Sequence, residues 1–383
     1  MIKWPFPRAA YIDHDKTFRP LMEKLAQEPL LAIDTESNSL YAYRSRVCLI
    51  QISTRKTDYI LDPLRIADLS PFGVLLANPR IEKIFHAAEY DLVGLKRDYG
   101  FELHNLFDTM VAARICGIKG VGLGAMLTNY VSSSIPLDKS HQRDDWGQRP
   151  LSESSLLYAQ MDTHYLPALR DRLHVELKRR GHLAEALELF EETSTVPLIN
   201  PEVDPEGYWK IGIPRSLNRR QMAILRRLYL LREELAEELD TPPFKVMNDS
   251  VLVAITEANL SSLRDLYYVR GLSDSQVARY GEDIMAAVEA GKEDKAPRPP
   301  KPTPPSDPAL VERYTTLLDW RKHHARQRGV ESDIVISKGA LWAIAGRYPH
   351  TLHELEGIPG LGPWRLETYG VSLLDALKNM NGK

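Results

Sequence analysis

Roughly the first half of the chain contains both short apolar or alternating runs and longer runs with regularly spaced apolar residues. Longer stretches there, such as Leu106–Gly117 and Ser152–Arg179, have the apolar spacing of helices. Four shorter runs are apolar or alternate apolar with polar residues, as strands do: Leu30–Ser37, Val47–Ser53, Asp58–Asp62 and Lys83–Ala87. Strands mixed with helices predict an α/β domain in which neighbouring strands can run parallel or antiparallel.

The second half of the chain has apolar residues at helical spacing, and it contains one pattern twice. A shift of 89 residues superimposes the two copies without a gap, placing Leu228 on Leu317 and Arg232 on Arg321. The shared positions are mostly apolar, so they specify the same core twice. We therefore expect two small all-α domains.

Proline marks the clearest boundary. Seven of the thirteen residues in Ala296–Pro308 are Pro, which favours an extended, semi-rigid linker. A weaker break lies at Leu198–Pro214, where Pro and Gly interrupt any helix. The breaks predict an α/β domain, a first helical domain, a linker and a second helical domain: residues 1–207, 208–292, 293–307 and 308–383.

Composition narrows the class of protein. Of 383 residues, 43% are hydrophobic and 26% are charged, as in ordinary globular proteins. No apolar run approaches the roughly 18–20 residues that cross a membrane, and Met1–Pro7 has no apolar core behind it as a signal peptide would. Cys48 and Cys116 are too few for a disulfide scaffold or a cysteine zinc site. We expect a cytoplasmic protein.

Charge is unevenly distributed around the net value of −3. Residues 1–209 carry 24 Lys and Arg against 29 Asp and Glu, and the rest is near neutral. A strongly basic coat is therefore absent, and any contact with nucleic acid must use local patches.

Two carboxylates lie near the end of the first apolar run. Asp34 and Glu36 are two residues apart, so on a strand they point to the same face. Like charges that project together from a buried edge are costly unless a cation compensates them, and a divalent metal would do so. The alternative is an ordinary surface strand end, which the pair alone does not exclude.

Three further side chains could join these two. Tyr158 and Asp162 are four residues apart, which places them on one helical face. A phenol beside a carboxylate can orient a metal-bound water, although a core Tyr beside a surface Asp is the alternative. Asp91 follows a strand-like run, and its alternative is helix capping, the interpretation that we prefer for Asp108.

The combination is more specific than its parts. Asp34-x-Glu36, then Asp91, then Tyr158-x3-Asp162 resemble the four carboxylates and the tyrosine of the DEDD superfamily of 3′→5′ exonucleases. The sequences around them are similar to those of ribonuclease D and its exosome-associated relatives: AIDTES, VCLIQIS, HAAEYDL, NLFDT, DWGQRPLS and YAQMDTHYL. The two repeats resemble HRDC domains. The resemblance implies a ribonuclease H-like α/β domain, with a mixed sheet flanked by helices, followed by two HRDC domains.

One position departs from the resemblance. Many bacterial members of the family have an aromatic residue after the first Asp-Thr-Glu, where Ser37 stands here. The departure leaves the carboxylates intact, and it puts in doubt how the substrate end is packed.

The resemblance implies two-metal hydrolysis of a phosphodiester, with two Mg²⁺ or Mn²⁺ ions. By the family pattern, Asp34 would bridge both ions, while Glu36 and Asp162 would complete the site of the ion that activates water. Asp91 would serve the second ion. Tyr158 would position the attacking water and help to deprotonate it. Nucleoside 5′-monophosphates would leave the 3′ end one at a time.

Five residues are weaker candidates for contact with substrate. Thr35, between the first two ligands, could contact the terminal sugar, or it could be ordinary strand structure. Lys139, Trp146 and Arg149 lie in a polar loop that could hold the scissile phosphate, the alternative being a solvated loop. His86 is the fifth candidate, and a strand-end histidine with its hydrogen bonds satisfied is the interpretation we favour for it.

The second repeat contains a glycine-rich turn, Gly357-Ile-Pro-Gly360-Leu-Gly362, that resembles a helix-hairpin-helix turn. Backbone amides at such a helix start can contact phosphate. The first copy has Val269-Arg270-Gly271-Leu272-Ser273 at that place. Auxiliary RNA binding by the repeats is the functional interpretation, and turn geometry is the alternative.

The resemblance favours an exoribonuclease that trims tRNA precursors and other small structured RNAs with free 3′ ends. A 3′→5′ DNA exonuclease of the Werner type keeps the fold and changes the substrate. A non-catalytic RNA-binding module is the alternative from another class, and the presence of all five site residues argues against it. We expect a monomer with no obligate protein partner and no membrane contact.

Overall fold

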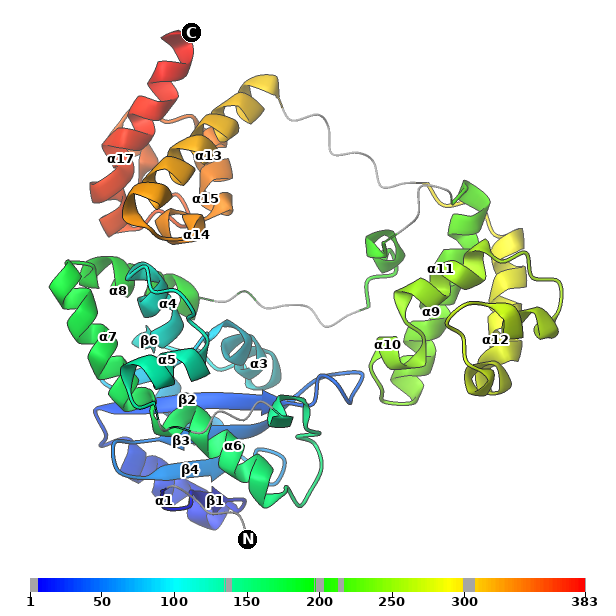
Figure 1. The fold of residues 1–383 in the computed structure, drawn as a ribbon, viewed down its shortest axis with the longest axis horizontal. Helices are drawn as coiled ribbons and strands as arrows, with labels where there is room; N and C mark the ends of the chain where they lie inside the picture. Colours follow the sequence, from blue (N-terminus) through cyan, green and yellow to red (C-terminus); the bar gives the residue numbers. More distant parts are fainter. Residues whose placement is uncertain are drawn as a thin grey trace. The chain divides into compact units, whose positions relative to one another are not determined.

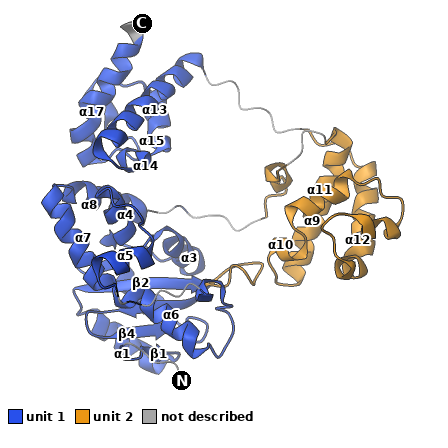
Figure 2. Ribbon diagram, in the orientation of Figure 1, with its two compact units in different colours: residues 1–36, 47–199, 303–383 blue, residues 37–46, 200–302 orange. Residues whose placement is uncertain are grey.

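The computed structural model describes residues 6–133, 135, 140–195, 197, 203–212, 217–298 and 307–382. Its contacts divide the chain into two compact units, which Figure 2 shows in different colours. The first unit combines the α/β domain with the second repeat: residues 1–36, 47–199 and 303–383. The second unit combines the first repeat with a short segment from the α/β domain: residues 200–302 and 37–46.

A six-stranded mixed sheet lies at the centre of the α/β domain (Figure 1). The strand order is β1-β4-β3-β2-β5-β6. Strand β1 runs parallel to β4, β4 antiparallel to β3, and β5 parallel to both β2 and β6. The strands are β1 (Ala10–Ile12), β2 (Leu30–Ser37), β3 (Val47–Ser53), β4 (Asp58–Leu61), β5 (Glu82–Phe85) and β6 (Leu106–Asp108). The mixed sheet with flanking helices confirms the expected fold class.

Burial along the strands explains why these runs pair at the centre. Every residue of β3 is buried. In β4, Tyr59 and Leu61 join the main core, while Ile60 between them joins a smaller cluster that includes Trp146. Both faces of β4 are therefore covered, as expected where helices flank a sheet.

Helices flank this sheet and complete the domain. They are α1 (Asp15–Leu25), α2 (Ser70–Ala77), α3 (Glu89–Tyr99), α4 (Thr109–Ile115), α5 (Leu123–Tyr130), the 3₁₀ turn η1 (Ser140–Arg143), α6 (Glu153–His164), α7 (Leu166–Arg180) and α8 (Leu183–Ser194). Helix α6 packs on β3 and β4, and α8 packs on β6.

Two predicted helices are wrong in their limits. The stretch Leu106–Gly117 begins as the edge strand β6, and helix α4 starts only after Asp108, whose side chain accepts from the N–H groups of Met110 and Val111. The stretch Ser152–Arg179 is two helices, α6 and α7. Pro167 lies in the first turn of α7, where its missing N–H leaves no hydrogen bond unmade.

Each repeat is a compact bundle of helices with its own core. The first contains α9 (Arg219–Glu238), α10 (Pro243–Val246), α11 (Asp249–Glu257), the 3₁₀ helix η3 (Leu263–Tyr268) and α12 (Asp274–Glu293), preceded by η2 (Gly207–Lys210). The second contains α13 (Pro308–Arg328), α14 (Ser332–Val335), α15 (Lys338–Arg347), α16 (Leu352–Leu355), α17 (Pro363–Lys378) and η4 (Asn379–Gly382). The shift of 89 residues places the start of each element in the first bundle, from α9 to α12, on the start of its counterpart, α13 to α17.

Within the described residues, the helices lack the length and apolar character that crossing a membrane would require.

Candidate active site

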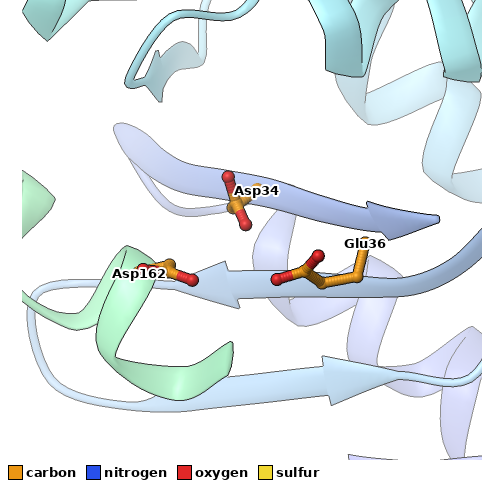
Figure 3. Close-up of side chains that lie close together, drawn as sticks. All are labelled: Asp34, Glu36 and Asp162. Atoms are coloured by element: carbon orange, nitrogen blue, oxygen red, sulfur yellow. The ribbon is translucent and has the colours of Figure 1, made fainter. Parts of the chain in front are cut away.

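Strand β2 carries the first two site residues out of the core. Its first four residues are buried, and its last four, which include Asp34 and Glu36, are partly exposed. Apolar side chains therefore anchor the strand, while its polar end remains partly accessible to solvent. Figure 3 shows Asp34, Glu36 and Asp162 pointing toward one another, with Asp162 arriving from α6.

Helix α6 is fixed to the sheet by polar side chains. Gln160 donates to Asp58 (Nε2 to Oδ2, 2.6 Å), and His164 Nδ1 lies 2.7 Å from the same oxygen. The hydroxyls of Thr163 and Ser53 lie 2.7 Å apart. At 100° per residue, Gln160, Thr163 and His164 occupy the helix face opposite to Tyr158 and Asp162. These anchors therefore hold the two site residues toward β2.

The three carboxylates form a close cluster. One oxygen from each of Asp34, Glu36 and Asp162 can be chosen so that all three lie within 4.8 Å of one another. Burial and repulsion from neighbouring carboxylates hold the pKa values of Asp34 and Glu36 well above the ordinary value. Burial, followed by the charge of Asp91, raises the pKa of Asp162 to about 7. The cluster holds excess negative charge, which a bound cation would relieve.

Asp91 lies beside this cluster on α3. It is 8% exposed, and its Oδ1 accepts from both the backbone N–H (2.9 Å) and the hydroxyl (2.6 Å) of Thr35. Burial raises its pKa to about 7, although the two hydrogen bonds oppose that shift. Helix α3 begins after Ala88, so Asp91 lies within its first turn and is not its N-cap residue.

Asp108 has the capping role that we preferred for it. Besides capping α4, its carboxylate accepts from the N–H groups of Ala87 (3.2 Å) and Ala88 (2.8 Å). Ala87 has a φ of 66°, an unusual conformation for a residue with a Cβ. Asp108 thus holds the turn that leads from β5 into α3 and so helps to place Asp91.

Tyr158 lies beside the cluster, one helical turn before Asp162 on α6. Its phenol interacts with Asp162, and the side chain of Gln142 from η1 interacts with the phenol. Burial, and then the charges of Asp162 and Glu36, raise its pKa above the ordinary value of 10.0. In the absence of a metal the phenol is therefore protonated at neutral pH.

The donor set fits a hard divalent cation. Asp34, Glu36, Asp162 and the adjacent Asp91 offer carboxylate oxygens, the ligands that Mg²⁺ and Mn²⁺ prefer. Burial is the main cause of their raised pKa values, and the charges of neighbouring carboxylates add to it. The geometry therefore matches a metal-dependent site at the end of the central strand β2.

Comparisons with known proteins agree with this geometry. A family model described as 3′-5′ exonuclease matches residues 9–178, and a model of the HRDC domain matches residues 221–288 and 311–377. Ribonuclease D of Gluconacetobacter diazotrophicus is 31% identical over 98% of this chain and 94% of that protein. Ribonuclease D of Jannaschia sp. is 32% identical over 94% of this chain and 92% of that protein. The chain belongs to the ribonuclease D family.

Solved structures support the assignment. The crystal structure of Escherichia coli RNase D, described as an exoribonuclease involved in structured RNA processing, has a TM-score of 0.67 and 28% identity. That match covers 97% of this chain and 99% of the other. The catalytic core of RRP6 from Trypanosoma brucei has a TM-score of 0.68 and 26% identity over 76% of this chain and 81% of that core. This member of the ribonuclease D family is a 3′→5′ exoribonuclease.

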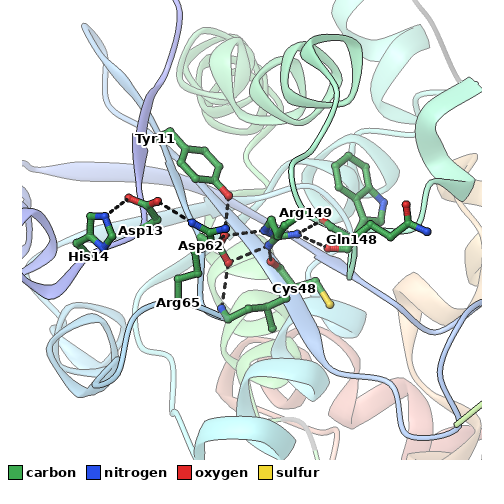
Figure 4. Close-up of polar contacts among 10 residues, drawn as sticks. Tyr11, Asp13, His14, Cys48, Asp62, Arg65, Gln148 and Arg149 are labelled. Carbon is green, nitrogen blue, oxygen red and sulfur yellow. Dashed lines mark hydrogen bonds and ion pairs between the residues drawn. The ribbon is translucent and has the colours of Figure 1, made fainter.

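Two residues expected to contact substrate are instead part of the scaffold in this family member. The Arg149 guanidinium donates to both oxygens of Asp62 (Nε to Oδ2, 2.6 Å; Nη2 to Oδ1, 2.8 Å) and to the carbonyls of Cys48, Trp146 and Gln148. Figure 4 shows this network, in which the Tyr11 hydroxyl also donates to Asp62. The Trp146 side chain is 1% exposed. We therefore correct the expectation that Arg149 and Trp146 hold the scissile phosphate.

The other weak candidates have different outcomes. Thr35 uses its hydroxyl on Asp91, so its described role is to place a carboxylate. His86 Nδ1 lies 2.8 Å from the Thr109 hydroxyl, which favours the strand-end interpretation, and its contact with substrate stays a prediction. Lys139 lies outside the described residues.

Sequence reasoning missed the turn that borders Tyr158. Asp144 accepts from His141 (Nδ1 to Oδ2, 2.7 Å) and from the Ser155 hydroxyl (2.6 Å), which ties η1 to the first turn of α6. The His141 ring lies 6.0 Å from the Tyr158 ring, and the charge of Asp144 adds to the raised pKa of Glu36. The structure of a polar loop is rarely predictable from one sequence. The one indication of a role for these residues was that they lie close to Tyr158 along the chain.

Proposed function

We propose that this exoribonuclease hydrolyses RNA from the 3′ end with two divalent metal ions and releases nucleoside 5′-monophosphates. The convergence of Asp34, Glu36 and Asp162 within 4.8 Å carries the proposal. Bound Mg²⁺ or Mn²⁺ would supply Lewis-acid stabilisation of the attacking and leaving oxygens.

Each site residue has one task in this scheme. Asp34, the central carboxylate, would help to hold both ions. Glu36 and Asp162 would help to hold the ion that activates the attacking water, and Asp91 would help to hold the other ion. Thr35 supports that arrangement, because its two hydrogen bonds fix the Asp91 carboxylate.

Tyr158 orients the attacking water. The phenol interacts with Asp162 on one side and with Gln142 on the other, so its oxygen is held at the edge of the carboxylate cluster. A fixed hydroxyl can hold water in line with the scissile bond, which lowers the entropic part of the barrier.

The substrates we propose are tRNA precursors and other small structured RNAs with single-stranded 3′ ends. Support comes from the Escherichia coli relative, whose description names structured RNA processing. Recognition of the terminal sugar would separate RNA from DNA, because the 2′-hydroxyl is the group that differs.

The test uses a 5′-labelled RNA hairpin with a single-stranded 3′ tail, incubated with Mg²⁺, Mn²⁺ or EDTA. We expect a ladder that shortens from the 3′ end with either metal and is absent with EDTA. Tyr158→Phe should slow it by about 100-fold. Asp375→Asn, a change at an exposed carboxylate of α17, is the matched control and should leave the rate unchanged.

Two results would contradict the proposal. A ladder unaffected by EDTA would remove the metal mechanism. A gel shift of the RNA without cleavage under any metal would favour the binding-module alternative. A matched DNA strand is run in parallel, and equal rates on RNA and DNA would remove the preference for RNA.

A further inference from the structure

The last helix of each repeat begins in a different way. In the first repeat, Ser273 caps α12, and Gln276 completes a capping box by accepting from the Ser273 N–H. The shift of 89 residues places Gly362 on Ser273 and Arg365 on Gln276. Gly362 has no side chain to cap α17, so this helix start needs another acceptor for its free N–H groups.

Glu188 of helix α8 supplies that acceptor. Its Oε2 accepts from the backbone N–H of Trp364 (2.6 Å) and of Arg365 (3.3 Å). A Cβ on Gly362 would overlap the Glu188 carboxylate and Cγ. The glycine therefore leaves the space that the carboxylate fills, and a group from the exonuclease domain replaces the internal cap.

Arg365 adds a cation to the same contact. Its side chain is 2% exposed, and Nη1 lies 2.7 Å from Glu192 Oε2 and 3.4 Å from Glu188 Oε1. Its Nε donates to the Val335 carbonyl (3.1 Å), just as Gln276 donates to the Val246 carbonyl (2.6 Å) in the first repeat. Arg365, which takes the place of Gln276, thus keeps the hydrogen bond within its repeat and adds a positive charge that points to α8.

Other ion pairs surround this contact. Glu185 of α8 is 0% exposed and pairs with Arg328 (2.7 Å), which also donates to the Tyr369 hydroxyl. In the opposite sense, Arg114 of α4 pairs with Glu331 and Asp333. The facing surfaces are therefore complementary in charge at three places, which fixes the orientation of two surfaces more than it adds affinity.

We propose that the glycine-rich turn and the start of α17 form a docking surface for helix α8 of the chain's own exonuclease domain, with Glu188 occupying the position that an RNA phosphate would take. A helix N-terminus binds either anion. The carboxylate has the advantage because it belongs to the same chain, where effective concentrations of about 1 mM or more are usual.

The experiment measures the distance between the two docked parts in the full chain. Spin labels are placed at Val175→Cys on α7 and Val371→Cys on α17, which are 64% and 59% exposed, whereas Cys48 and Cys116 are buried. We expect one narrow distance distribution by pulsed electron paramagnetic resonance. Glu188→Lys should broaden it, whereas Glu191→Gln, at an exposed position of the same helix, should not.

A second variant separates docking from folding. Combining Glu188→Ala with Gly362→Ser removes the docking carboxylate and imports the cap of the first repeat. Helix content and the melting temperature should be retained while the distance distribution broadens. A narrow distribution in both this variant and Glu188→Lys would overturn the proposal.

Single-stranded RNA in EDTA tests the competing occupant of the turn. We expect it to leave the wild-type distribution narrow. Broadening on addition of RNA, together with tighter RNA binding by Glu188→Ala, would show that the turn takes phosphate and would overturn the proposal. Because these readouts are distance and affinity, they are independent of whether the exonuclease assay succeeds.

Discussion

Asp34 and Asp62 each lie near the end of a strand, but the charged groups around their two carboxylates are of opposite sign. Asp34 follows the buried first half of β2, and Asp62 directly follows β4. Asp62 is compensated by Arg149 and Tyr11, and these hydrogen bonds outweigh burial and lower its pKa. Burial, and then the charges of neighbouring carboxylates, raises the pKa of Asp34.

The charges around each carboxylate distinguish an acid that can bind metal from one that supports the fold. A buried carboxylate with a bidentate arginine is already neutralised and can only hold structure. A partly exposed carboxylate among others of its kind keeps its charge uncompensated until a cation arrives. Helix α6 is fixed to the sheet by another acid, Asp58, and its own Asp162 completes the uncompensated cluster.

The largest expected effect is at the uncompensated cluster. Asp34→Asn keeps the shape and removes the central charge, so we expect kcat to fall by about 1,000-fold, equivalent to about 4 kcal/mol of transition-state stabilisation. Mn²⁺ binding, measured by calorimetry, should weaken in parallel. Retention of full activity would contradict the metal assignment.

The compensated pair should respond in stability. Arg149→Met leaves Asp62 buried without its cation, which should lower the free energy of unfolding by about 3–5 kcal/mol. Urea denaturation measures this loss. Arg55→Met is the matched control, because its pair with Asp171 is 46% and 43% exposed and should contribute at most about 1 kcal/mol. Equal losses in the two variants would show that burial of the Asp62 pair has no energetic importance.

A smaller effect distinguishes the acids of the cluster from Asp62, namely the pH dependence of their contributions to stability. Asp91 and Asp162 have pKa values raised to about 7, so the metal-free native state holds protons that the unfolded chain releases near pH 4. Their contribution to stability is complete below about pH 4 and is lost as pH rises toward 7. Asp62 has a lowered pKa, so its contribution is present above about pH 4 and is lost at lower pH.

Urea denaturation in EDTA between pH 5 and 7.5 checks the first part of this prediction, and added Mg²⁺ should reverse the loss. Asp34→Asn removes one of the repelling charges and should make the metal-free protein less sensitive to pH. A metal-free stability that rises across this range would contradict the raised pKa values.

Local sequence predicted the elements best where one pattern dominated. The limits of β2 and β3 matched the runs Leu30–Ser37 and Val47–Ser53, because an apolar strand buried on both sides has few alternatives. Helix α6 shows the limit of such patterns. Its inner face uses Gln160 and Thr163, so polarity does not distinguish the anchored side from the catalytic side.

Site residues divided in the same way. The spacing of Asp34 with Glu36, and of Tyr158 with Asp162, placed each pair on one face of its own element. Arg149 was expected to contact substrate. Nothing in the sequence around a loop arginine indicates that it pairs with the buried Asp62, which is 87 residues away.

The strands, the repeats and the order of the carboxylates follow from local patterns, since periodicity and short spacings are local properties of the chain. Which charges are compensated depends on the folded arrangement. In the folded chain Arg149 pairs with Asp62, the carboxylates of β2 and α6 lie together as candidate metal ligands, and Glu188 accepts hydrogen bonds at the start of α17. Compensation depends on distances between residues far apart in sequence, and those distances exist only once the chain has folded.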